Sequence, residues 1–85
     1  MDTTRTITFE DMTGLQAMSM TGTEDKNLRV IEECFGKTIT FRDNTFTILD
    51  CNDNTYQQIN DVLTALFEVA KKNQVVSEAD AIYAC

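Results

Sequence analysis

The chain has 85 residues, of which 42% are hydrophobic and 25% charged, and this is enough for one small domain with a modest core. It has no histidine, three unclustered cysteines and only three glycines, which excludes most zinc sites, histidine-based catalysis and glycine-rich nucleotide loops. Fourteen acids against seven bases give a net charge of −7, the wrong sign for a protein that depends on neutralising phosphates. Composition predicts a small acidic domain that is not an enzyme on its own.

The N-terminal part of the chain predicts a strand followed by a short helix. Residues 5–9 alternate polar and apolar side chains and are expected to bury Ile7 and Phe9. Acidic residues at positions 10 and 11 are expected to open a helix whose apolar side chains recur at helical spacing: Met12, Leu15 and Met18. The methionines are interpreted as core residues, with a contact surface for a partner as the alternative.

A glycine turn and a second helix follow. Gly22 is free to take a positive φ in the turn over residues 21–25. Asp25 is the predicted N-cap of a helix over residues 26–35, which Gly36 ends. One arc of this helix is apolar and is formed by Leu28, Ile31, Cys34 and Phe35. The opposite side carries charged residues, namely Lys26, Arg29 and Glu33, and an Arg29–Glu33 ion pair is expected at i,i+4 spacing.

The second half of the chain predicts a hairpin and a long helix. Two alternating segments, 37–42 and 45–49, flank the turn residues Asp43 and Asn44. Their shared buried face is expected to hold Ile39, Phe41, Phe46 and Ile48. Residues 52–54 break the strand and cap a helix that runs to about Lys72. Its apolar face is formed by Tyr56, Ile59, Val62, Leu63, Leu66, Phe67, Val69 and Ala70.

These elements predict an α+β fold in the order β-α-α-β-β-α, with a three-stranded antiparallel sheet and the helices packed on one face. Ser77 is expected to begin a further helix, which the end of the chain truncates at Cys85. We therefore expect a domain over residues 1–76, followed by residues 77–85 as the start of a helix that leads into a further domain.

The cysteines and the short apolar runs indicate the cellular compartment of the protein. Cys34 and Cys51 are interpreted as small buried hydrophobic residues and Cys85 as a terminal thiol, without a disulfide framework. The start of the chain has no signal-peptide core, and the longest apolar run is the five residues 81–85. A cytoplasmic protein without a membrane partner is expected.

The predicted element order is that of the KH domain, which holds single-stranded nucleic acid with a GXXG loop between its first two helices. Here that loop is Gly22-Thr23-Glu24-Asp25, with an acid in place of the second glycine. The window from position 26 to 42 holds four bases and two acids, a local charge of +2. Nucleic acid is accordingly expected to contact the glycine turn and the basic residues after it: Gly22, Thr23, Lys26, Asn27, Arg29, Lys37 and Arg42.

A second resemblance extends over nearly the whole chain. Residues 22–33, residues 39–44 with their Arg-Asp-Asn hairpin, the Leu-Phe-Glu segment at 66–68 and residues 76–84 resemble, in order and spacing, the N-terminal part of PhoH-like proteins. This resemblance implies an N-terminal KH-like accessory domain of a phosphate starvation-related P-loop ATPase linked to RNA metabolism. ATP and Mg²⁺ are then expected in the missing ATPase domain, and this part of the chain has no cofactor.

Two functions of different classes remain open, beside a third in which the domain is a purely structural cap on the next one. The basic window favours weak RNA binding that positions a substrate for the attached ATPase. The acids at positions 24 and 25, together with the lack of an obvious exposed aromatic residue for base stacking, favour a protein-interaction or oligomerisation module. Such a module would arrange ATPase subunits as a homo-oligomer or recruit an RNA-processing protein. The glycine turn is then an ordinary interhelical loop, and Lys37 and Arg42 only solubilise the ends of a strand.

Overall fold

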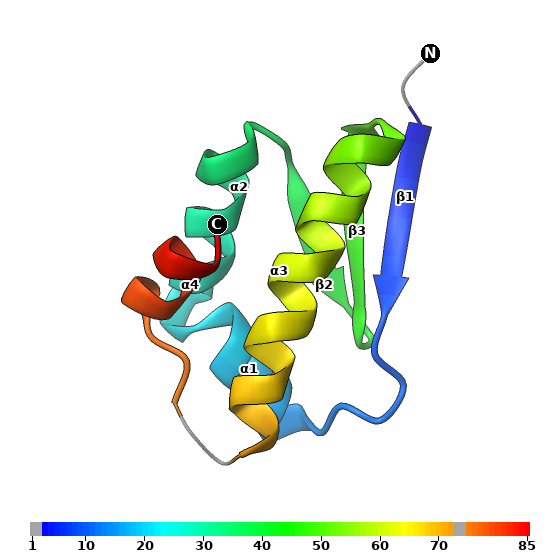
Figure 1. The fold of residues 1–85 in the computed structure, drawn as a ribbon. Helices are drawn as coiled ribbons and strands as arrows, with labels where there is room; N and C mark the ends of the chain where they lie inside the picture. The colour runs from blue at the N-terminus through cyan, green and yellow to red at the C-terminus, as the bar shows by residue number, and fades with distance from the viewer. Residues whose placement is uncertain (1–2, 73–74) are drawn as a thin grey trace.

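The computed structural model describes residues 3–72 and 75–85 and shows an α+β fold (Figure 1). Its elements in chain order are β1 (Thr3–Thr8), α1 (Gly14–Thr21), the 3₁₀ turn η1 (Thr23–Asp25), α2 (Lys26–Phe35), β2 (Ile39–Arg42), β3 (Thr45–Cys51), α3 (Asp53–Lys71) and α4 (Glu78–Ala84). The three strands form an antiparallel sheet in the order β1-β3-β2, and the helices lie on one of its faces. The predicted sheet and the predicted order of the elements are confirmed.

The hairpin between β2 and β3 forms as predicted. Asp43 and Asn44 have φ angles of 52° and 60°, the pair of positive values that a two-residue type I′ turn requires. This turn sets the register, in which Ile39 faces Ile48 across the two strands. The neighbouring Phe41–Phe46 pair brings its rings to a centroid distance of 4.6 Å, and the predicted apolar face of the hairpin turns towards the helices.

Strand β1 is attached to the start of α3 through Arg5. Its guanidinium forms an ion pair with Asp53 and lies 5.4 Å from the centre of the Tyr56 ring. Its Nε also donates a hydrogen bond of 3.3 Å to the carbonyl of Cys51, beside an irregularity in the β1–β3 register. These contacts join β1 to the end of β3 and to the first turn of α3.

Helix α3 confirms the long helix that was predicted to run from residues 52–54 to about Lys72. Asn52 caps it, since its Oδ1 accepts a hydrogen bond of 2.8 Å from the backbone N–H of Thr55. Its buried side chains lie on the predicted face and are Ile59, Val62, Leu63, Leu66, Phe67 and Ala70. None of the helices in the described part of the chain, α3 included, combines the length and the apolar character needed to cross a membrane.

The first helix differs from the prediction in both its start and its buried face. It begins at Gly14, four residues later than expected, because Thr13 and Gln16 form a reciprocal capping box. Leu15 and Met18, predicted to be buried, are 80% and 69% exposed. The late start places a different stripe against the core, formed by Ala17, Met20 and Thr21. Met12 is buried, but it lies in the loop before the helix.

Helix α4 packs into the same core as the rest of the chain. Ser77 caps it as predicted, in a second capping box with Asp80. Val76 and Ala81 are 4% and 0% exposed and belong to the core cluster that includes residues of the sheet. Residues 77–85 therefore contribute to this domain, against α2 and α3, whatever follows them.

Candidate nucleic-acid interface

The turn between α1 and α2 depends on Gly22. This residue has φ 79° and ψ 171°, a conformation that is essentially confined to glycine. A Cβ atom at this position would lie 2.9 Å from Cγ of Asn27, so there is also no room for a side chain here. The predicted positive φ of Gly22 is confirmed, and the turn brings the backbone close to the first turn of α2.

Asn27 is the reason for that close approach. Its side chain is buried, with 2% of the residue exposed, and its Nδ2 donates to the carbonyls of Ser19 and Val76 at 3.2 and 2.9 Å. These two bonds join α1, α2 and the segment before α4. Asn27 thus lies inside the structure and positions the turn. Its side-chain amide does not face the surface, where nucleic acid was expected to contact it.

The acidic part of the turn differs from the expected cap. Glu24 and Asp25 have φ angles of 55° and 60°, and both side chains are exposed. Asp25 occupies the N-cap position of α2 but makes no capping hydrogen bond, because an N-cap side chain reaches the helix N–H groups from an extended conformation, not a left-handed one. The N–H of Lys26 instead donates to the carbonyl of Thr23 in the 3₁₀ turn. The prediction of Asp25 as a cap was wrong.

Lys26 and Arg29 are the exposed cations of the N-terminal half of α2. They are three residues apart on one helix, and no ion pair joins either of them to a residue in the ranges 3–72 and 75–85. The expected Arg29–Glu33 ion pair is therefore not formed. Both cations line an open cavity of about 370 Å³ between α2 and the start of α4, together with Val30, Glu33 and Glu78.

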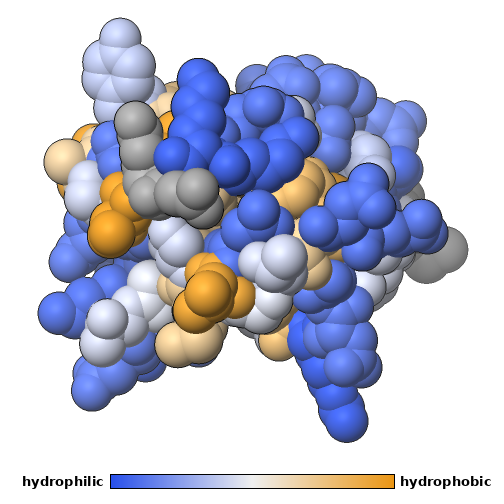
Figure 2. Space-filling view, turned by 90° about the horizontal axis from the view of Figure 1, so that it is seen from below, coloured by the Kyte–Doolittle hydropathy of each residue, from blue (hydrophilic) through white to orange (hydrophobic). Residues whose placement is uncertain are grey.

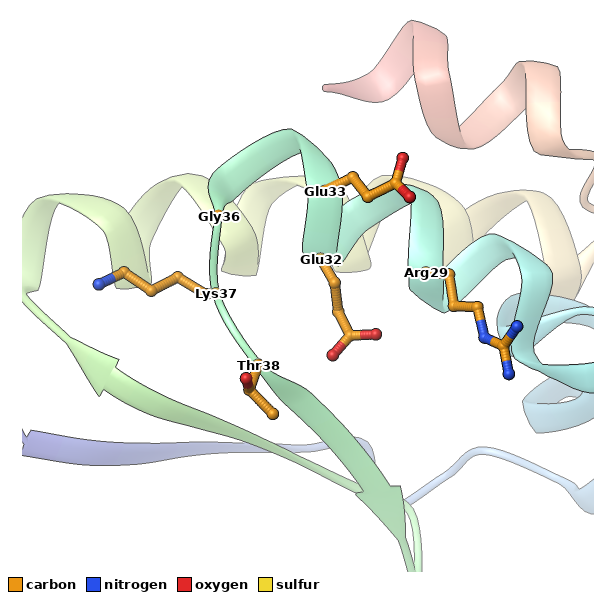
Figure 3. A pocket seen from close by; sticks show the side chains of 6 residues that line it. All are labelled: Arg29, Glu32, Glu33, Gly36, Lys37 and Thr38. Atoms are coloured by element: carbon orange, nitrogen blue, oxygen red, sulfur yellow. The ribbon is translucent and has the colours of Figure 1, made fainter.

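A second cavity, of about 320 Å³, lies between α2 and the segment entering β2 (Figure 3). It is lined by Arg29, Glu32, Glu33, Gly36, Lys37 and Thr38. Figure 3 shows the Glu32 carboxylate inside this groove, with Arg29 at one end and Lys37 turned away at the other. Glu32 Oε2 accepts a hydrogen bond of 2.9 Å from the N–H of Ile39, so this carboxylate satisfies an edge donor of β2.

The other two predicted basic residues lie apart from Lys26. The ammonium of Lys37 donates to the carbonyl of Asp50, near the end of β3. Arg42 lies at the hairpin, where its Nε is 3.8 Å from the carboxylate of Asp43 and its side chain is 92% exposed. Of the seven predicted contact residues, Gly22, Thr23, Lys26 and Arg29 lie in the turn and the first part of α2, and Lys37 shares the second cavity with Arg29. Thr23 lies exposed in that turn.

One exposed aromatic residue was not predicted from the sequence. Tyr83 on α4 is 93% exposed, although no stacking platform was expected. The signal was available, because Ser77 predicts the helix and a buried Ala81 places position 83 about 200° away on the helix surface. A flat ring of this kind suits stacking against a base or packing against a protein.

Comparison with known proteins adds no assignment. No protein-family model, no curated protein and no solved structure matches this chain.

Proposed function

We propose that this chain is a KH-like domain that binds single-stranded nucleic acid, with RNA as the first ligand to test. Three features support this: the β-α-α-β-β-α order, the β1-β3-β2 antiparallel sheet, and a glycine turn between the first two helices. The observation that carries the proposal is the pair of exposed cations without an ion-pair partner among the described residues, Lys26 and Arg29, directly after that turn.

The proposed ligand path runs from the Gly22 turn along α2. Successive phosphates contact Lys26 and then Arg29, which lines both cavities beside α2. The nucleotides then continue into the groove between α2 and β2, past Thr38. Because two cations on one helix fix the backbone without reading base edges, we expect little sequence preference from this contact.

The affinity of this path is expected to be low. Glu24 and Asp25 are exposed at the turn, and Glu32 places a carboxylate inside the groove, so a phosphate backbone meets repulsion close to both cations. The net charge of −7 also slows the approach of a polyanion. Weak binding suits an accessory domain that holds a strand near another active domain.

The attached domain is the second part of the proposal. The resemblance of residues 22–33, 39–44, 66–68 and 76–84 to PhoH-like proteins supports a P-loop ATPase following this domain, with ATP and Mg²⁺ bound there. In that arrangement the present domain delivers RNA to the ATPase in the cytoplasm.

The test is fluorescence anisotropy with a labelled RNA of about ten nucleotides, longer than the roughly four that a KH loop holds. Titrations at about 50 and 200 mM salt should give saturable binding that weakens with salt, with a log–log slope near −1.4 for two phosphate contacts on a single strand. Lys26→Glu should weaken binding about tenfold and flatten the slope by about one phosphate contact.

Lys72→Glu is the matched control, because it makes the same charge change at an exposed lysine on the C-cap of α3, outside both cavities. It should alter the affinity by less than about threefold. The proposed path would be refuted if no saturable binding occurred at the lower salt concentration. It would also be refuted if both variants lost RNA affinity equally.

The second candidate is a protein-interaction or oligomerisation module, which the exposed apolar side chains of α1 favour. Leu15 and Met18 are largely exposed, and the α1 end of the molecule carries apolar patches between hydrophilic side chains (Figure 2). Dependence of the oligomeric state on concentration, abolished by Leu15→Glu, together with a failure of RNA to bind, would establish this alternative.

A further inference from the structure

Two cysteines that are distant in the sequence meet where α4 packs on α2. Cys34 lies on the last turn of α2, and Cys85 is the C-cap residue of α4. Both line one cavity of about 300 Å³, together with Val30, Glu33 and Ile82. Beside burial, the Cys34 thiol contributes to the raised pKa of Cys85, so the two side chains lie within range of each other. The sequence analysis treated Cys34 as a buried core residue, which was wrong, because both cysteines are exposed.

The packing around the pair holds the two helices in place. Ala81 is completely buried between α4 and the core, one helical turn before Cys85, whose N–H donates to the Ala81 carbonyl at 3.2 Å. Cys85 follows the last helical residue of α4, so its backbone is less constrained than that of Cys34. The two thiols face one cavity from two helices that pack on each other.

The surroundings of Cys85 lower the reactivity of its thiol. Partial burial, and then the neighbouring Cys34 thiol, raise the pKa of Cys85 to about 12, so this residue is protonated at neutral pH. The carboxylates that line the cavities beside it, Glu33 of α2 and Asp61 of α3, add no positive charge that would favour a thiolate. Since the thiolate is the nucleophile, this raised pKa slows attack by Cys85 on a disulfide.

We propose that Cys34 and Cys85 form a reversible disulfide that fastens α4 to α2, with a low-molecular-weight disulfide such as oxidised glutathione as the oxidant. Cys51 takes no part, because it is buried in the core at the end of β3. The bridge closes a long loop through β2, β3 and α3, and it makes the position of α4 dependent on the thiol–disulfide balance around the protein.

The reaction is a two-step exchange. The Cys34 thiolate attacks one sulfur of the small disulfide, which forms a mixed disulfide at Cys34 and releases one small thiolate. Cys85 then loses its proton to water, and its thiolate attacks Sγ of Cys34 and displaces the second small thiol. In total, two protein thiols are oxidised by two electrons, and one small disulfide is reduced to two thiols.

The raised pKa of Cys85 makes the second step slow at neutral pH. Because the thiolate fraction of Cys85 rises about tenfold per pH unit below its pKa, ring closure should accelerate by about that factor between pH 7 and pH 8. The mixed disulfide at Cys34 should therefore accumulate at pH 7 and convert to the bridge at pH 8.

The experiment is intact-mass and peptide analysis of the 85-residue chain after incubation with oxidised glutathione, with remaining thiols blocked by an alkylating agent. The expected product at pH 8 is a monomer with a Cys34–Cys85 linked peptide and a single alkylated cysteine. Its Tm should exceed that of the reduced chain by about 10 °C or more, and dithiothreitol should reverse the change.

Two variants assign the roles. Cys85→Ser should stop at the mixed disulfide on Cys34, and Cys34→Ser should acquire glutathione at least about tenfold more slowly at pH 7. The proposal is overturned if Cys85→Ser acquires no glutathione at Cys34. It is equally overturned if the wild-type product is a disulfide-linked dimer, or if both cysteines keep separate glutathione adducts at pH 8.

Discussion

The two ends of helix α2 carry similar numbers of charged side chains but use them differently. At the C-terminal end, Glu32 accepts the N–H of Ile39, and Lys37, in the segment that follows α2, donates to the carbonyl of Asp50, so both charges bond to the backbone of the sheet. At the N-terminal end, Lys26 and Arg29 have no ion-pair partner among the described residues. The charges that support the fold are thus separated along one helix from those left for a ligand.

This contrast indicates where substitutions will affect stability and where they will affect binding. Changes around the Gly22 turn and the C-terminal end of α2 should lower the free energy of unfolding. Changes at the exposed cations should leave folding intact and alter only affinity.

The largest stability effect is expected at Gly22. Gly22→Ala forces an alanine into a conformation that glycine alone adopts readily and places its Cβ against Asn27, so the free energy of unfolding should fall by about 2–3 kcal/mol. Urea denaturation measures this change. Gly14→Ala is the matched control, because no atom lies within 4 Å of a Cβ there, and it should leave stability unchanged or raise it by up to about 1 kcal/mol. Equal losses in the two variants would refute the role assigned to the turn.

An intermediate effect is expected at Glu32, with opposite signs for folding and binding. Glu32→Ala leaves the N–H of Ile39 without its acceptor and should cost about 1–2 kcal/mol of stability. Glu32→Gln keeps an acceptor oxygen and should cost less than half of that. Because Glu32→Gln also removes a negative charge from the groove, RNA affinity should rise about two- to threefold. If Glu32→Gln lowered the affinity for RNA, the ligand would not lie in the groove beside Glu32.

The smallest effect is expected at Lys37. Lys37→Met removes the hydrogen bond to the Asp50 carbonyl but keeps the length of the side chain, so stability should fall by less than about 1 kcal/mol. Since the ammonium turns away from Arg29, RNA affinity should change by less than about twofold. A tenfold loss of affinity here would show that the Lys37 ammonium itself contacts a phosphate in the groove, contrary to the role assigned to it.

Much of the fold could be predicted from the sequence, because short segments of the chain specify most of its turns and helices. Asp43-Asn44 specifies a two-residue turn, and Asn52 with the apolar period after it specifies α3. The same local reasoning failed at α1, where it placed the start of the helix at the acidic residues 10 and 11, whereas the Thr13–Gln16 capping box sets the start at Gly14. That signal was present in the sequence and was overlooked.

The candidate site was less predictable, because it depends on contacts between distant segments. The sequence grouped Arg42 and Lys37 with Lys26 by their spacing, whereas the fold directs them to the hairpin and to β3. Asn27 was expected at the ligand, but its bond to the carbonyl of Val76 makes it a buried connector. No local pattern shows that the start of α2 meets the segment before α4.

The most direct test compares the RNA affinities of Arg29→Glu and Arg42→Glu at about 50 mM salt, where electrostatic binding is strongest. Both variants reverse one exposed arginine, so they change the net charge equally. If the N-terminal end of α2 holds the phosphates, Arg29→Glu should lose about tenfold in affinity or more and Arg42→Glu less than about threefold. Equal losses, or a larger loss at Arg42, would contradict this account.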